Sequence, residues 1–218
     1  MIPRTLALPA AVLLTWCLAS SSAATAAADE PAANPGGAAA GRAISVIVVG
    51  DADYSLTYAF KAMVPQVTTR FVALSDFRPD QKADLLVFVG SVPERAPEGV
   101  PALYVDTLPP GGGVTQAAGA DGKPAVVGET TVLVQASDHP ALRGINARNC
   151  TFTNVRKLQA AQGWSTLLGN QDAALVLAND AGKTRQMVIA FRPEDSSWPL
   201  KPSYAIFMFN AVLHLSGR

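Results

Sequence analysis

The chain has 218 residues, of which 49% are hydrophobic, and its 17 basic and 17 acidic residues give a formal net charge of zero. The length suits one domain with an appendage, and the apolar fraction is enough for a sizeable core. No basic stripe is present to hold phosphates, so nucleic acid is not an expected partner.

The N-terminal region has the pattern of a targeting segment and a linker, and it is not expected to belong to the folded domain. Arg4 precedes an apolar segment, 6–19, and then small residues with several A-x-A cleavage options, so residues 1–28 are interpreted as a signal peptide. The protein is therefore expected to be exported, to the periplasm or outside the cell. No charge occurs in 5–28, so an uncleaved signal that tethers the chain to a membrane is the alternative. Residues 29–42, rich in Ala, Pro and Gly, predict a disordered linker.

Residues 43–218 are expected to form one α/β domain. Apolar, β-branched runs bounded by turn residues predict strands in the first half, and the segment 54–64 has the apolar spacing of a helix. Strands that are separated by helical or loop segments indicate a parallel sheet. The predicted strands of this half are 44–49, 67–74, 84–89 and 101–105.

The pattern changes after Pro110 to short strand candidates separated by turns, which indicates antiparallel additions to the sheet. The chain ends with a buried strand and a helix from about Pro202 that is apolar on nearly every face and should be packed. The predicted class is a flavodoxin-like, mostly parallel α/β sheet flanked by helices. The short strand candidates are 126–127, 131–134, 150–155, 164–168, 174–178 and 186–191.

Polar residues follow several of the predicted strands. The carboxyl ends of parallel strands meet at one edge of a sheet, so these side chains are candidates for a ligand-binding edge. The alternative interpretation is that they cap helices and satisfy turns. The residues concerned are Asp51, Asp53, Ser91, Asp106, Glu194 and Asp195.

Other candidate groups predict no site. His139 lies in an Asp-His-Pro turn, and His214 lies in the last turn of the final helix, where it suits the helix dipole. Two histidines far apart in the sequence and Cys150, the one cysteine that remains if the predicted signal with Cys17 is removed, do not predict a metal site. The glycines 111–113 lack the Lys and Ser/Thr of a phosphate loop, and no cofactor is expected.

Two segments resemble signatures of the class I glutamine amidotransferases. VPALYVDTL resembles the strand that leads to that family's nucleophilic cysteine, and VIAFRPED resembles the strand that ends in its histidine and glutamate. DLLVFVGSVPE lies where the family has its oxyanion loop. The resemblance puts Asp106 at the cysteine position and Arg192 at the histidine position, and it keeps Glu194.

This sequence resembles a divergent branch of that superfamily more closely than it resembles the amidotransferases themselves. The branch is the amidotransferase-like domain of bacterial membrane proteins that also carry a von Willebrand factor A domain, of the Bat aerotolerance type. HPALRGIN and DSSWPLKPSYAIFMFNAVLHL carry this resemblance, which covers about 44–215. It implies an envelope partner of the von Willebrand factor A or ATPase type.

The degenerate triad predicts loss of catalysis. Glutamine hydrolysis needs a thiolate and a base, whereas aspartate is a poor acyl-forming nucleophile and arginine stays protonated. The expected function is therefore an exported, catalytically inactive domain for binding or assembly at the cell envelope. In such a domain Asp106 and Arg192 are expected to pair, with bidentate geometry, and the alternative is that Arg192 points to solvent from the end of its strand. The alternative function is a hydrolase that uses Asp106, Ser91 or Glu194.

Overall fold

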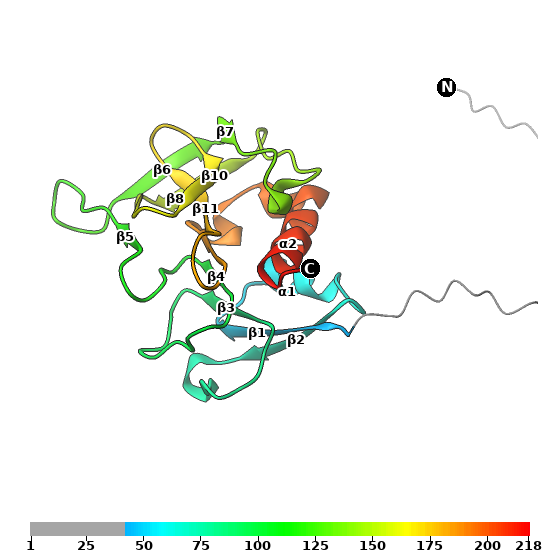
Figure 1. Ribbon diagram of the computed structural model, residues 1–218. Coiled ribbons are helices and arrows are strands. Elements are labelled where there is room, and N and C mark those ends of the chain that lie inside the picture. The colour runs from blue at the N-terminus through cyan, green and yellow to red at the C-terminus, as the bar shows by residue number, and fades with distance from the viewer. Residues whose placement is uncertain (1–41) are drawn as a thin grey trace, which may run out of the picture. The chain divides into compact units, whose positions relative to one another are not determined.

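An eight-stranded sheet organises residues 42–218, the part of the chain that the computed structural model describes (Figure 1). Its order is β2-β1-β3-β4-β12-β11-β10-β7, in which the first five strands run parallel and the last three continue antiparallel. The parallel part has the 2-1-3-4-5 order of flavodoxin-like folds. The predicted fold class is confirmed. The strands are β1 (Ile44–Gly50), β2 (Val67–Val72), β3 (Leu85–Val89), β4 (Ala102–Val105), β7 (Val134–Gln135), β10 (Ser165–Gly169), β11 (Ala174–Asn179) and β12 (Gln186–Ile189).

The long connection between β4 and β12 holds the antiparallel additions. Besides β7, β10 and β11, it contains two small sheets, each formed by a pair of antiparallel strands. The predicted strand 131–134 is wrong, because one strand ends and another begins inside it. Two three-residue strands were not predicted, since so short a run shows no alternation. The pairs are β5 (Val114–Gln116) with β9 (Leu158–Ala160), and β6 (Val126–Thr131) with β8 (Thr151–Arg156).

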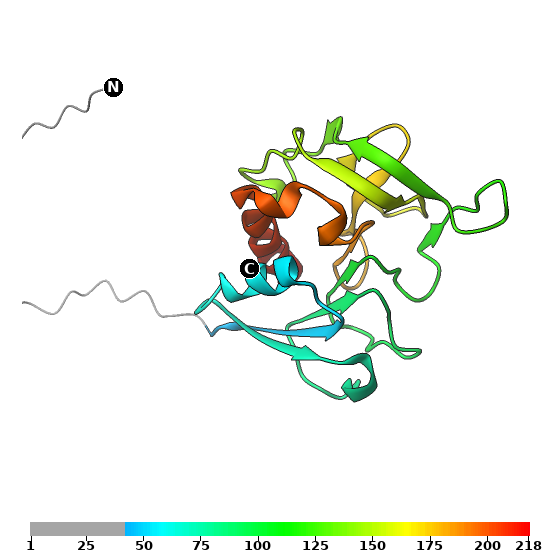
Figure 2. The same ribbon diagram turned by 180° about the vertical axis from the view of Figure 1, so that it is seen from behind.

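Two α-helices, α1 (Tyr54–Lys61) and α2 (Pro202–Leu215), lie side by side on one face of the sheet (Figures 1 and 2). α1 ends earlier than the predicted 54–64, because the residue before Pro65 is disfavoured in a helical conformation. Short 3₁₀ turns complete the connections: η1 (Leu74–Asp76), η2 (Pro140–Leu142), η3 (Pro193–Asp195) and η4 (Trp198–Leu200).

The alternation of side chains along the strands divides the core in two. On one face, residues such as Val48 and Val87 pack with Phe60 of α1 and Phe207 of α2. On the other face, Phe88 and its neighbours pack under loops and 3₁₀ turns. The prediction of a sheet flanked by helices therefore holds for one face only. Within 42–218 no α-helix covers the second face.

The final helix is packed, as its all-apolar sequence predicts. Phe207, Met208 and Val212 are fully buried, whereas Ile206 is 46% exposed. None of the helices in 42–218 is both long and apolar enough to cross a membrane. The predicted signal 1–28, and all but the last residue of the predicted linker, lie outside the described residues.

Candidate functional site at the carboxyl edge of the sheet

Asp106 lies at the carboxyl edge of the sheet, directly after β4. Its N–H donates to the carbonyl of Ile189 at 2.9 Å, which joins β4 to the end of β12. Its φ of 50° is in the left-handed region, which aspartate enters more readily than most residues. Only 11% of its side chain is exposed, so both carboxylate oxygens need partners.

Two arginines supply those partners. Arg156 Nε donates to Asp106 Oδ1 at 2.5 Å, and Arg192 Nε donates to Oδ2 at 2.8 Å. Arg156 Nη1 also donates to Gln116 Oε1 at 3.0 Å, which fixes its guanidinium a second time. The predicted contact between Asp106 and Arg192 is therefore present. The predicted bidentate geometry is wrong, because each oxygen binds a different guanidinium. We call Asp106, Arg156 and Arg192 the Asp106 clasp.

The electrostatics of the clasp exclude the role that the amidotransferase resemblance gives to the Arg192 position. The hydrogen bond to Asp106, and then the charge of that carboxylate, raise the pKa of Arg192. A guanidinium held protonated in this way cannot accept a proton from a nucleophile. Arg156 was not predicted to belong to the site, because it comes from β8, in the long connection between β4 and β12, rather than from the parallel strands.

A pocket of about 170 Å³ lies beside the clasp, between the carboxyl ends of β1 and β3. The strand order reverses at this pair, and open α/β sheets bind ligands at such a position. The predicted convergence of polar groups is therefore largely present. The polar residues that line the pocket are Asp51, Asp53, Ser91, Arg192 and Glu194.

The predicted site residues differ in what they do. Asp53 accepts a hydrogen bond from the N–H of Leu56 at 2.7 Å, so for this residue the capping interpretation is correct. Asp195 does not line the pocket, and its Oδ1 accepts from Asn154 Nδ2 at 3.3 Å. Glu194 Oε1 lies 3.6 Å from Arg192 Nη1.

Sequence reasoning missed Tyr204 of α2, whose hydroxyl is buried without a hydrogen-bond partner among the described residues. Burial raises the pKa of Tyr204, and the charges of Asp53 and Glu194 add to the effect. The hydroxyl therefore remains neutral and lies close enough to these two carboxylates to sense their charge.

The described residues hold no amidotransferase triad at this edge. The Asp106 carboxylate is occupied by two guanidinium groups. Cys150 is 1% exposed, and burial raises the pKa of its thiol, which opposes formation of the nucleophilic thiolate. Both histidines of the chain lie elsewhere. The edge therefore binds and orders side chains, but it has no nucleophile–base pair.

A second polar cluster joins His139, Asp180 and His214. Asp180 follows β11, at the end of the sheet where β4 and β12 begin, so the cluster lies at the edge opposite the clasp. His139 Nε2 and His214 Nε2 lie 3.0 and 2.7 Å from the two oxygens of Asp180. The expectation that the histidines form no metal site rested on their separation in sequence, and the fold removes that reason.

Protonation within this cluster is set by burial and hydrogen bonds. Burial lowers the pKa of His139, and the charge of His214 lowers it further, against the opposing hydrogen bond to Asp180. Burial raises the pKa of Asp180, but the hydrogen bonds with His214 and His139 outweigh it and hold that pKa below its ordinary value. The cluster thus favours a charged carboxylate beside a neutral His139 imidazole.

Comparisons with known proteins define the fold and nothing finer. No family model matches the chain, and no curated protein matches it. The structure is similar to the cytoplasmic protein STM1381 from Salmonella typhimurium LT2, with a TM-score of 0.59 and 10% identity over 79% of this chain and 99% of that chain. It is also similar to the cytoplasmic protein STM3548 from Salmonella typhimurium, with a TM-score of 0.54 and 9% identity over 79% of this chain and 98% of that chain.

These neighbours correct the predicted localisation. Both are described as cytoplasmic proteins, which points away from the export predicted from 1–28. The prediction of a periplasmic or extracellular protein is therefore contradicted by the names of these neighbours and is not carried further. Its support was the pattern of Arg4, an apolar segment and A-x-A options, and an apolar run followed by Ala-rich sequence does not by itself distinguish a signal from another small-residue segment. At identities near 10% the likeness shows the fold alone.

Proposed function

We propose that this chain is a catalytically inactive amidotransferase-like domain that acts by binding a partner rather than by turning over glutamine. The Asp106 clasp carries this proposal. At the position where the resemblance expects a nucleophilic cysteine, the chain has a carboxylate held by Arg156 and Arg192 at 2.5 and 2.8 Å. Charge-assisted hydrogen bonds of this kind are strong and keep the carboxylate away from a substrate carbonyl.

The pocket beside the clasp supports binding better than hydrolysis. Its volume of about 170 Å³ is below the ~300–1,000 Å³ typical of small-molecule sites, and suits one polar side chain of a partner. Asp51 and Glu194 make its rim acidic, which favours a basic group. The resemblance implies a partner of the von Willebrand factor A or ATPase type, and such a protein would supply that group.

The alternative, a hydrolase, is favoured only by the presence of Ser91 in the same pocket as Asp51 and Glu194. Serine chemistry needs a base in hydrogen-bond contact with the hydroxyl. Among the described residues Ser91 makes no such side-chain contact. The binding proposal therefore remains the better account of this edge.

Ammonia release from glutamine tests the inactive state. The full-length chain is expected to release none above a buffer blank. Asp106→Cys alone should not gain activity, because Arg192 still supplies no base. Measurable release by the unmodified chain that disappears in Asp106→Ala would overturn the proposal, provided that circular dichroism shows both proteins folded.

A titration tests the binding role. A von Willebrand factor A or ATPase protein encoded beside this chain should bind the full-length chain in calorimetry. Glu194→Ala should weaken that complex, whereas Asp172→Ala, an exposed acid in a turn away from the pocket, should not. Absence of a complex, or equal effects of the two substitutions, would contradict the assignment of this edge as the partner-binding face.

A further inference from the structure

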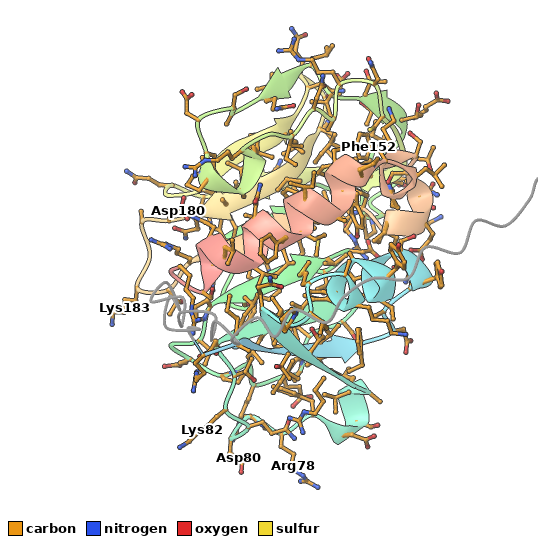
Figure 3. The ribbon with its side chains drawn as sticks, turned by 90° about the vertical axis from the view of Figure 1, so that its right-hand side faces the viewer. Arg78, Asp80, Lys82, Phe152, Asp180 and Lys183 are labelled. Atoms are coloured by element: carbon orange, nitrogen blue, oxygen red, sulfur yellow. The ribbon has the colours of Figure 1, made fainter. Side chains whose placement is uncertain are left out.

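Both histidines of the chain meet at one carboxylate. His139 immediately precedes η2, Asp180 lies in the turn after β11, and His214 lies in the last turn of α2, so three distant segments converge. Figure 3 shows Asp180 beside the C-terminal end of α2, with Phe152 near the other end of the helix. Two imidazoles that meet at one carboxylate indicate a ligand site more strongly than an isolated surface histidine does.

The geometry of the cluster is compact. The imidazole rings of His139 and His214 lie 4.6 Å apart between centroids and are inclined by 67°, with both Nε2 atoms directed at Asp180. One ligand atom from each residue can be chosen so that all three lie within 4.8 Å of one another. The histidine side chains are 11% and 8% exposed, whereas Asp180 is 40% exposed. Two fixed donors therefore lie beneath a carboxylate that solvent can reach.

We propose that His139 Nε2, His214 Nε2 and the carboxylate of Asp180 form a binding site for a divalent cation of the zinc class. Two imidazole nitrogens and one carboxylate are a donor set that zinc accepts, with a fourth position left for water. The accessible side of Asp180 provides that fourth position and the entry route. The proposal is independent of the glutamine chemistry considered for the opposite edge.

The hydrogen bonds of the cluster define what the ion must replace. Zinc lies about 2.0–2.2 Å from nitrogen and oxygen ligands, so a bound ion needs Nε2 and Oδ slightly farther apart than the present 2.7 and 3.0 Å. Asp180, in a partly exposed turn, is the member that can shift. The ion takes the place of the protons that now join the two rings to the carboxylate.

Both rings must also give up the Nε2 proton that they donate to Asp180, and at His139 a second contact is affected. Ala141 N–H donates to His139 Nδ1 at 3.2 Å, so the neutral His139 ring carries its proton on Nε2 and donates it to Asp180. Metal binding at Nε2 places that proton on Nδ1 and breaks the contact with Ala141. At His139 the hydrogen bonds with Ala141 and Asp180 are therefore both exchanged for metal–ligand bonds.

Arg185 limits the strength of the site. Its Nη1 donates to the carbonyl of His214 at 2.5 Å, which puts a positive charge next to the cluster. The charge of this guanidinium opposes a cation, while that of Asp180 favours it. A micromolar dissociation constant is expected rather than the much tighter binding of closed structural zinc sites.

Calorimetry with zinc chloride tests the proposal on the full-length, chelator-treated chain without a histidine tag. One equivalent should bind with a micromolar or lower dissociation constant. Asp180→Asn and His139→Gln should each weaken binding by about 100-fold or more, beyond the 10–100-fold typical of residues that only support a ligand. Asp172→Asn, an exposed carboxylate outside the cluster, is the matched control and should bind as the unmodified chain does.

Cobalt substitution separates this site from the cysteines. The Co²⁺ spectrum should show ligand-field bands without a thiolate charge-transfer band, because no sulfur belongs to the set. No zinc binding, binding that survives Asp180→Asn and His139→Gln unchanged, or a thiolate band in the cobalt spectrum would each overturn the proposal. Asp180 lies in an exposed turn, so Asp180→Asn gives a decisive result even if a histidine variant fails to fold.

Discussion

The two edges of the sheet each hold one carboxylate between two nitrogen-bearing side chains, but the nitrogens differ. At the carboxyl edge Asp106 binds two arginines, and at the opposite edge Asp180 binds two histidines. Arginine stays protonated and offers no lone pair, so its pairing with an acid can only hold structure together. Histidine exchanges protons near neutral pH and binds metals. The same arrangement therefore gives a structural clasp at one edge and a chemically competent cluster at the other.

The helix α2 connects the two edges, and its core anchor gives the largest expected effect. Phe207 is fully buried and its ring lies 4.8 Å from that of Trp198. Phe207→Ala should lower the free energy of unfolding by about 3–5 kcal/mol, measured by chemical denaturation. Ile206→Ala, at the neighbouring position but 46% exposed, should cost about 1 kcal/mol or less. A loss for Phe207→Ala as small as that for Ile206→Ala would mean that α2 is peripheral.

Removing the charge of the clasp should have the next largest effect. Asp106→Asn keeps a residue that tolerates the positive φ but loses two charge-assisted hydrogen bonds, so we expect a loss of about 2–3 kcal/mol in unfolding free energy. Asp121→Asn is the control, because Asp121 and its partner Lys123 are mostly exposed and 3.6 Å apart, and less than about 1 kcal/mol should be lost. A clasp variant as stable as this control would show that Asp106 is not a structural anchor.

The two arms of the clasp should be unequal. Arg156 is 29% exposed and is held by Gln116 as well, whereas Arg192 is 56% exposed and its pairing is screened by water. Replacement by methionine keeps the apolar stem in each case. Arg156→Met should therefore destabilise by about 1 kcal/mol more than Arg192→Met in the same denaturant titration. A larger loss for Arg192→Met would mean that Arg192, and not Arg156, makes the stronger bond to Asp106.

The smallest expected effect sharpens the comparison at the histidine edge. Arg185→Gln removes a positive charge beside His214 while leaving a group that can still donate to its carbonyl. Zinc binding in calorimetry should become severalfold tighter, because the unfavourable charge near the cation is gone. A weaker affinity would mean that Arg185 contributes to the site by positioning the end of α2 rather than by its charge.

Local patterns in the sequence were enough to predict the parallel strands and the packed final helix. The β-branched runs at 44–49 and 84–89 and the apolar residues after Pro202 each specify their element without reference to the rest of the chain. The order of strands then followed the common flavodoxin-like arrangement. The pairing of Asp106 with Arg192 was expected from the amidotransferase resemblance, which puts both residues at one edge of the sheet.

The contacts of residues in the long connection between β4 and β12 could not be predicted from local patterns. Arg156 reaches Asp106 only because the end of β8 meets the end of β12, where Arg156 N–H donates to the carbonyl of Ala190 at 2.8 Å, and nothing near Arg156 in the sequence specifies that contact. His139 and His214 likewise meet only after η2 packs against α2. Contacts of this kind depend on how a long connection folds back, and local periodicity carries no information about that. The predicted helices pack on one face of the sheet, and within 42–218 loops and 3₁₀ turns cover the other.

A zinc titration followed by nuclear magnetic resonance tests the contrast between the edges most directly. The full-length chain has only two histidines, so its imidazole signals report on the His139–Asp180–His214 cluster, while the Nε–H signals of Arg156 and Arg192 report on the clasp. We predict that zinc shifts both imidazoles and leaves the two arginine signals in place. Unchanged imidazoles, or arginine signals that move because the ion displaces them from Asp106, would contradict the account.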